Sequence, residues 1–177
     1  MTSPTIKAIE THYKGYRFRS RLEARWAVFF DTLGIEWQYE PEGFELPDGT
    51  RYLPDFWLPY FESYVEIKGQ TPSGAEYKKA QHLAKSHPVF IFAGDPYAAF
   101  AWHFSWASLF AENPCVIEQL GPTNCTIQWV KNRYGHCITF FPDDDRDWEK
   151  PNLIMRGDAQ MACTRARSAR FEHGERA

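Results

Sequence analysis

Three residues that can carry chemistry stand close together in the segment YLPDFWLPYFESYVEIKG: Asp55, Glu66 and Lys68. Side chains two residues apart on a β-strand project from the same face, so a strand over SYVEIKG presents Glu66 and Lys68 side by side. Asp55 falls on the strand just before, where its carboxylate is expected to meet that of Glu66 across the strand pair. The spacing therefore predicts two carboxylates and one ammonium group at one place.

These groups suit the hydrolysis of phosphodiesters. Two neighbouring carboxylates are the hard oxygen ligands that Mg²⁺ and Mn²⁺ prefer, and these ions keep the rest of their shell for water or phosphate oxygens. A bound ion would polarise the phosphate and activate a water, which Lys68 would orient or deprotonate while stabilising the transition state. Pro54 marks a strand edge or distortion that exposes Asp55, and Gly69 permits close approach of a ligand.

Pro54-Asp55 followed by Glu66-Ile67-Lys68 resembles the motif of the PD-(D/E)XK nucleases, at a spacing typical of that family. The similarity covers roughly residues 13–95. It implies a restriction-endonuclease-like core and a Mg²⁺-dependent DNA endonuclease, with Mn²⁺ as a substitute ion. In such a site Asp55 bridges the metal ion or ions, Glu66 and the Ile67 carbonyl complete the protein ligands, and Lys68 acts on the water.

The same resemblance extends to two further residues. An acidic residue on the first core helix often joins the metal site in this family, and Glu23 stands at that place, where it would contact a second metal ion or its water. Gln70 would touch substrate or water. Glu23 has a second interpretation, because Ser20 followed by Glu23 is also a capping-box pattern that needs no metal ion.

Periodicity and capping signals predict the elements that position these residues. Apolar residues recur at helical spacing in SRLEARWAVFFDTLG, with Ser20 as N-cap and Gly34 as the stop. Ser73 and Glu76 open a second helix, AEYKKAQHLAKS, through another capping box. VFIFAG has the composition of a strand buried on both faces.

Between the two helices the sequence predicts an antiparallel meander. Its strands lie in IEWQYEP, in FELPDGTRYLPDFWL with a tight turn at Asp48-Gly49, and in SYVEIKG. The order of helix, three strands, helix and strand predicts an α/β fold with a mixed sheet.

The chain is expected to form a single domain over residues 13–141, with a core at 13–95 and peripheral additions at 96–141. Residues 1–12 are expected to be a flexible lead-in. YAAFAWHFSWASLF is apolar nearly all round and predicts a buried helix or two irregular pieces. A hairpin is expected at 125–141, turning near Asn132 to Gly135, and residues 142–177 are expected to form a polar, partly disordered tail.

Composition restricts the setting and the partners. The 177 residues carry a net charge of −3, so binding to DNA must depend on local basic patches. No apolar run is long enough to span a bilayer and no signal peptide is evident, so we expect a cytoplasmic protein, in the host cytoplasm if a phage encodes it. The four cysteines lack a metal-binding or disulfide spacing and are expected to be buried free thiols.

Candidate substrate-binding residues come from basic side chains near the site. Lys14, Arg17, Arg19, Arg21 and Arg25 crowd one segment, which forms either a phosphate-binding lip or a solvated face. On the second helix Lys78, Gln81 and Lys85 share a helical spacing and could flank the same groove. The set taken as substrate-binding is Gln70, Arg19, Arg21, Arg25 and Lys78. Asp143 to Asp145 are interpreted as a solvated acidic run.

Several alternatives remain open on the sequence alone. Asp55, Glu66 and Lys68 could instead be an exposed ion-pair face on the meander. The chain could be a catalytically silent module that binds nucleic acid or protein, or the nuclease subunit of a recombination or transposition assembly. Residues 96–141 could form a homodimer or partner interface. A stand-alone DNA endonuclease of a phage or mobile element is the favoured hypothesis.

Overall fold

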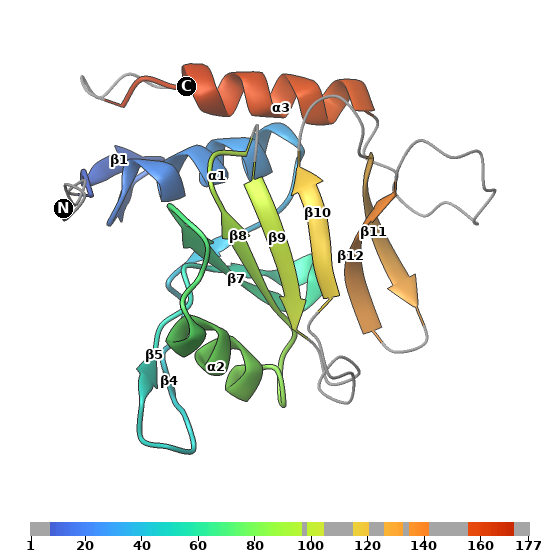
Figure 1. Ribbon diagram of the computed structural model, residues 1–177. Helices are drawn as coiled ribbons and strands as arrows, with labels where there is room; N and C mark the ends of the chain where they lie inside the picture. The colour runs from blue at the N-terminus through green and yellow to red at the C-terminus, as the bar shows by residue number, and fades with distance from the viewer. Residues whose placement is uncertain are drawn as a thin grey trace, which may run out of the picture.

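The computed structural model describes residues 8–96, 99–104, 115–120, 126–132, 135–141 and 156–171. Within these residues, helices pack on both faces of a six-stranded sheet of order β10-β9-β8-β7-β6-β3 (Figure 1). β7 and β8 run parallel and the other neighbours antiparallel, which confirms a mixed α/β fold. The elements are β1 (Thr11–Tyr13), β2 (Tyr16–Phe18), α1 (Arg21–Thr32), β3 (Gln38–Tyr39), β4 (Phe44–Glu45), β5 (Arg51–Tyr52), β6 (Phe56–Leu58), a 3-10 turn (Pro59–Phe61), β7 (Ser63–Lys68), α2 (Gly74–Leu83), β8 (Val89–Ala93), β9 (Ala99–Phe104), β10 (Cys115–Leu120), β11 (Thr126–Asn132), β12 (Gly135–Phe141) and α3 (Arg156–Ser168).

The sheet has a core on each face. α1 and α3 lie side by side on one face and α2 lies on the other (Figure 1). Alternate residues of β8 serve the two cores: Phe90 and Phe92 face α1 and α3, whereas Val89 and Ile91 face α2. All five residues of β8 are buried, as predicted for VFIFAG.

The capping signals of both predicted helices are used, in different ways. In α2 the box is complete, because the Ser73 N–H donates to Glu76 Oε2 and the Ser73 hydroxyl accepts from the Glu76 N–H. In α1 the Ser20 hydroxyl accepts from the Glu23 N–H, but the Glu23 carboxylate accepts from the Arg19 N–H, one residue before the cap. The Glu23 carboxylate is thereby turned toward the start of the helix.

The predicted meander is present, with an inserted hairpin. β3, β6 and β7 form the antiparallel run, while β4 and β5 pair separately in a two-stranded sheet that turns at Asp48-Gly49. Gly49 adopts a φ of +78°, which a tight turn of this kind requires. Pro54 lies between β5 and β6 and interrupts the strand that the sequence suggested there, as expected for a residue without an N–H.

The prediction of a helix or irregular pieces over YAAFAWHFSWASLF is wrong for Ala99–Phe104, which form strand β9. β9 pairs with β8 and contributes buried Ala101 and Trp102, so it belongs to the core and not to a periphery. A strand buried on both faces is as apolar as a buried helix, which explains the error. The predicted hairpin is confirmed, because β11 and β12 pair up to Asn132 and Gly135.

Both predicted ends of the domain were placed too far inside the chain. β1 starts at Thr11 in the expected lead-in, and α3 lies in the expected polar tail. Ala162, Cys163 and Ala166 of α3 are buried in the core beside α1, so the domain includes α3. Cys163 is a free thiol, as predicted. Asp143 to Asp145 lie outside the described residues, as does most of the link from β9 to α3.

Within the described residues, no helix is both long and apolar enough to cross a membrane.

Candidate active site

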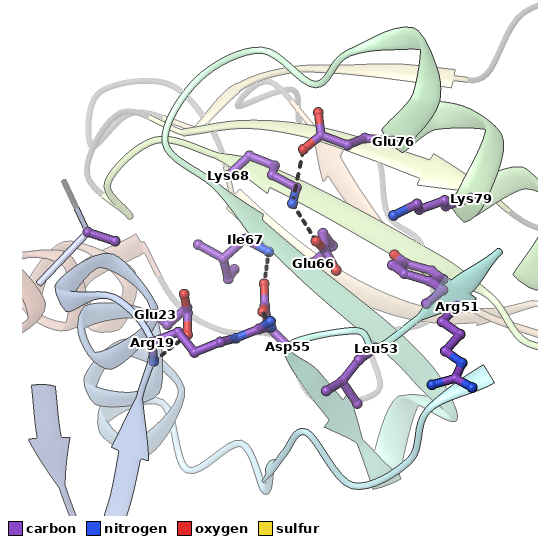
Figure 2. Close-up of a pocket in the computed structure, with 12 residues that line it drawn as sticks. Arg19, Glu23, Arg51, Leu53, Asp55, Glu66, Ile67, Lys68, Glu76 and Lys79 are labelled. Carbon is purple, nitrogen blue, oxygen red and sulfur yellow. Dashed lines mark hydrogen bonds and ion pairs between the residues drawn. The ribbon is translucent and has the colours of Figure 1, made fainter. Parts of the chain in front are cut away.

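Strand register brings Asp55 to Glu66. Phe56 stands opposite Val65 in the β6–β7 pair, and the same register continued by one residue sets Asp55 opposite Glu66. Both carboxylates are buried, with 3 % of Asp55 and 8 % of Glu66 exposed. Asp55, Glu66 and Lys68 line one pocket of about 480 Å³, which Figure 2 shows. The predicted face of β7 is therefore the face that the structure presents to this pocket.

Pro54 explains why the backbone opens here. In an antiparallel pair the residues that face each other across the hydrogen bonds exchange two N–H···O bonds. The β6–β7 register continued by two residues sets Ile67 opposite Pro54, which has no N–H to donate. The Ile67 N–H donates to the side chain of the next residue along, Asp55 Oδ2, at 2.7 Å. Pro54 therefore supplies no ladder bond to the Ile67 carbonyl, which faces the same side of β7 as the Ile67 N–H.

The Lys68 ammonium lies between two carboxylates. Its Nζ is 2.5 Å from Glu66 Oε1 and 3.0 Å from Glu76 Oε1, which comes from the first turn of α2 (Figure 2). Burial lowers the pKa of Lys68, but the two carboxylates outweigh burial and raise it above the usual value. Lys68 is thus held as a cation, which favours charge stabilisation over the removal of a proton from water.

Asp55 and Glu66 both have raised pKa values. Burial, followed by the charges of Glu66 and Glu23, holds the pKa of Asp55 well above its usual value, although the Ile67 N–H and Arg19 oppose the shift. Burial also raises the pKa of Glu66, against the effect of Lys68. The Tyr52 hydroxyl interacts with the Glu66 carboxylate and lowers its pKa, whereas Glu66 Oε2 itself is buried and accepts no hydrogen bond of good geometry among the described residues. A buried carboxylate oxygen with an incomplete set of donors can accept a further ligand.

Arg19 covers the other acid. Its Nη2 lies 2.8 Å from Asp55 Oδ1, and its Nε lies 2.6 Å from Glu40 Oε1. The arginine stands just before α1, and its side chain is 55 % exposed. Arg19 thus reaches the buried Asp55 carboxylate from the solvent side, where another cation can compete with it for the same oxygen.

Glu23 reaches the same pocket, but its oxygens are already engaged. Oε1 accepts from the Ser20 hydroxyl at 2.6 Å, and Oε2 accepts from the Tyr39 hydroxyl at 2.6 Å and from the Arg19 N–H at 3.1 Å. These bonds hold the carboxylate at the N-terminus of α1 in the pocket wall. Glu23 therefore both caps α1 and lines the pocket.

Only part of the predicted substrate-binding set lies at the pocket. Arg19 lines it, whereas Gln70, Arg21, Arg25 and Lys78 do not, and Arg25 pairs with Asp95 at 3.2 Å. The pocket also includes six residues that we did not predict as part of the site, and four of them are polar: Arg51, Tyr52, Glu76 and Lys79. The spacing of Glu76 and Lys79, three residues apart on a helix, was the available signal.

The donor set fits Mg²⁺ or Mn²⁺ in chemistry. Asp55, Glu66 and the Ile67 carbonyl are hard oxygen donors, and one or two carboxylates suffice for Mg²⁺ when water and phosphate complete its shell. In the described part of the chain, no group of three or more His, Cys, Asp or Glu side chains is arranged to hold a metal ion. Arg19 and Lys68 occupy oxygens of Asp55 and Glu66 in this arrangement.

In comparisons with known proteins, no protein-family model matches the sequence and no curated protein shows significant similarity to it.

Proposed function

We propose that the protein is a metal-dependent nuclease that hydrolyses DNA phosphodiester bonds, with an endonuclease favoured, on a restriction-endonuclease-like core. The observation that carries the proposal is the convergence of Asp55, Glu66 and Lys68 in one pocket, where both carboxylates are buried and the Lys68 ammonium contacts Glu66. A purely structural ion-pair face would be expected to lie exposed on the sheet, whereas a functional site gathers buried acids with strongly shifted pKa values in a pocket.

The residues take the following parts in this proposal. Asp55, Glu66 Oε2 and the Ile67 carbonyl would hold Mg²⁺ or Mn²⁺, with Glu23 in contact with a second ion or with water. When bound, the metal supplies Lewis-acid polarisation of the phosphate and activation of a water. Lys68, held as a cation, donates hydrogen bonds to the phosphate oxygens as negative charge builds up on them. Water adds to phosphorus, and the bond from phosphorus to a sugar oxygen breaks.

Plasmid cleavage tests this proposal. Purified protein should nick or linearise supercoiled DNA in Mg²⁺ or Mn²⁺, and EDTA should stop the reaction. The Asp55→Asn protein, purified in parallel, controls for a contaminating nuclease and should be inactive. Metal-dependent activity that is equal in the two proteins would refute the site. DNA binding without cleavage of duplex, branched or single-stranded substrates would favour the silent module.

The Arg19–Asp55 ion pair leads to a separate prediction about the metal. Since Arg19 places a positive charge on an Asp55 oxygen, Arg19→Gln should tighten Mn²⁺ binding without DNA, by up to about tenfold. Isothermal titration of the metal measures the change. Arg17→Gln removes the same charge from an exposed arginine paired with Glu10, and should leave the affinity near that of the wild type. Equal affinities in all three proteins would show that Arg19 does not compete with the ion.

A further inference from the structure

We propose that Arg51 and Lys79 each bind a backbone phosphate beside the one that is cut, and so position the DNA backbone along the pocket. This inference rests on the proposed nuclease function and adds substrate-positioning residues to it. Figure 2 shows both residues on the side of the pocket opposite Arg19 and Glu23, with Asp55, Glu66 and Lys68 between the two sides.

Lys79 is directed to the pocket by the phase of α2. Residues three apart on a helix share a face, so Lys79 lies one turn beyond Glu76, which contacts Lys68. Both Glu76 and Lys79 line the pocket, whereas Lys78, the neighbour of Lys79, lies outside it. A cation from α2 is therefore placed beside the reacting groups.

Arg51 is held by a hairpin that packs firmly on the same face. Leu46 and Tyr52 of the β4–β5 hairpin region are buried in the cluster beneath α2, with 5 % and 6 % of each exposed. The Phe44 and Tyr64 rings meet edge to face, with centroids 5.1 Å apart. Arg51 thus projects from an anchored strand and not from a loose loop. Such a scaffold can hold a ligand contact at a fixed place.

Arg51 and Lys79 differ from the other two cations of the pocket in their ion pairing. Among the described residues, Arg19 pairs with Asp55 and Glu40, and Lys68 pairs with Glu66 and Glu76. Arg51 and Lys79 form no ion pair with any of these residues, even though Glu45 stands directly opposite Arg51 in the hairpin. They are therefore the pocket cations whose charge is not already neutralised.

The ligand that suits each of these cations is a backbone phosphate. A guanidinium offers two parallel donors to the oxygens of one phosphate, and an ammonium binds another as a point charge. The protein has a net charge of −3, and its affinity for DNA must depend on a few local cations. Contacts of this kind fix the position of the DNA without reading its bases.

The salt dependence of DNA binding tests the assignment. The full-length Asp55→Asn protein, which should not cut, is titrated with a fluorescent DNA duplex in EDTA at several NaCl concentrations. Each phosphate contact contributes about −0.9 to the slope of log K against log salt. Adding Arg51→Gln or Lys79→Gln should each make the slope shallower by about that amount. Lys78→Gln removes the same charge one residue away and should leave the slope unchanged.

The outcomes separate this inference from the function on which it rests. If the wild type cleaves DNA but Lys79→Gln and Arg51→Gln bind with the slope of Lys78→Gln, the two residues are not phosphate contacts and only the inference fails. If the protein neither binds nor cleaves DNA, the proposed function fails and the inference fails with it. If Lys78→Gln makes the salt slope as shallow as Lys79→Gln does, the effect comes from the general positive charge of α2. That result would also overturn the assignment.

Discussion

Replacing Asp55 by asparagine is expected to abolish cleavage and to stabilise the protein. The loss of activity should reach about 10³-fold or more, because the variant removes a charged metal ligand from the reacting centre. In the absence of metal, the free energy of unfolding near neutral pH should rise by about 1 kcal/mol, as is common when a stressed functional group is neutralised. For a domain of this size that corresponds to about 2–4 °C in Tm.

The stability change follows from the raised pKa of Asp55. Its causes are burial and then the charges of Glu66 and Glu23. An acid with a higher pKa in the folded than in the unfolded chain binds its proton more tightly when folded. The free energy of unfolding therefore falls as pH rises from the unfolded value of about 3.9 through the folded pKa. The asparagine of the Asp55→Asn variant cannot ionise, so the advantage of this variant should be largest near neutral pH and should shrink toward pH 4.

Thermal unfolding from pH 4 to 8, together with plasmid cleavage, checks this prediction. Asp31→Asn is the matched control, because Asp31 lies outside the pocket and is well satisfied by Tyr13, Trp37 and Lys14. That variant should lose about 1 kcal/mol of stability and keep its activity. If Asp55→Asn is instead less stable than the wild type throughout this range, the Arg19–Asp55 pair is structural, and the ion-pair interpretation of the site gains support.

The sequence predicted the part of the site that depends on strand geometry. Glu66 and Lys68 share a face because side chains alternate along any strand, and Asp55 meets Glu66 because the strands are joined by a short reversal. The effect of Pro54 could also be predicted, since a missing N–H breaks a ladder in any context. These features need only local rules and a register.

The rest of the site depends on how separate elements dock, and local rules do not specify docking. Glu76 was fully explained by its capping box with Ser73, so nothing in the sequence pointed to Lys68 as a second partner. Lys78 was chosen over Lys79 because the rotation of α2 about its axis was not known. Arg51 reaches the pocket only because the β4–β5 hairpin folds back beside α2, which the sequence did not indicate.

The fold predictions failed for related reasons. β1 and β2 turn through Lys14 and Gly15, both at positive φ, and lysine gives no signal for that conformation. α3 has few apolar residues, and its buried side includes the small Ala162 and Ala166, which allow close approach to α1 without producing a hydrophobic pattern. In both cases the stabilising contacts lie between elements.

Glu76 connects the fold to the proposed chemistry, and Glu76→Gln is expected to lower kcat by about 10- to 100-fold with little change in KM. The Glu76 carboxylate uses Oε2 to cap α2 and Oε1 to hold the Lys68 ammonium at 3.0 Å. Glutamine preserves a capping box, so α2 and the Tm should be nearly unchanged. The side chain loses its charge, however, and Lys68 is then held by Glu66 alone, away from the position that serves the transition state.

Ser73→Ala separates the two roles of Glu76. It removes the hydroxyl that accepts the Glu76 N–H and donates to Glu76 Oε2, at a cost of about 1 kcal/mol. The Ser73 N–H still holds Oε2, and Oε1 keeps its contact with Lys68. We therefore expect Ser73→Ala to lower Tm and keep kcat, and Glu76→Gln to keep Tm and lower kcat. Steady-state kinetics and thermal unfolding of both variants measure the contrast. If each variant loses kcat only in proportion to its loss of Tm, Glu76 acts as a helix cap and Lys68 does not depend on it. If instead Ser73→Ala lowers only Tm and Glu76→Gln lowers only kcat, the first turn of α2 is part of the catalytic apparatus.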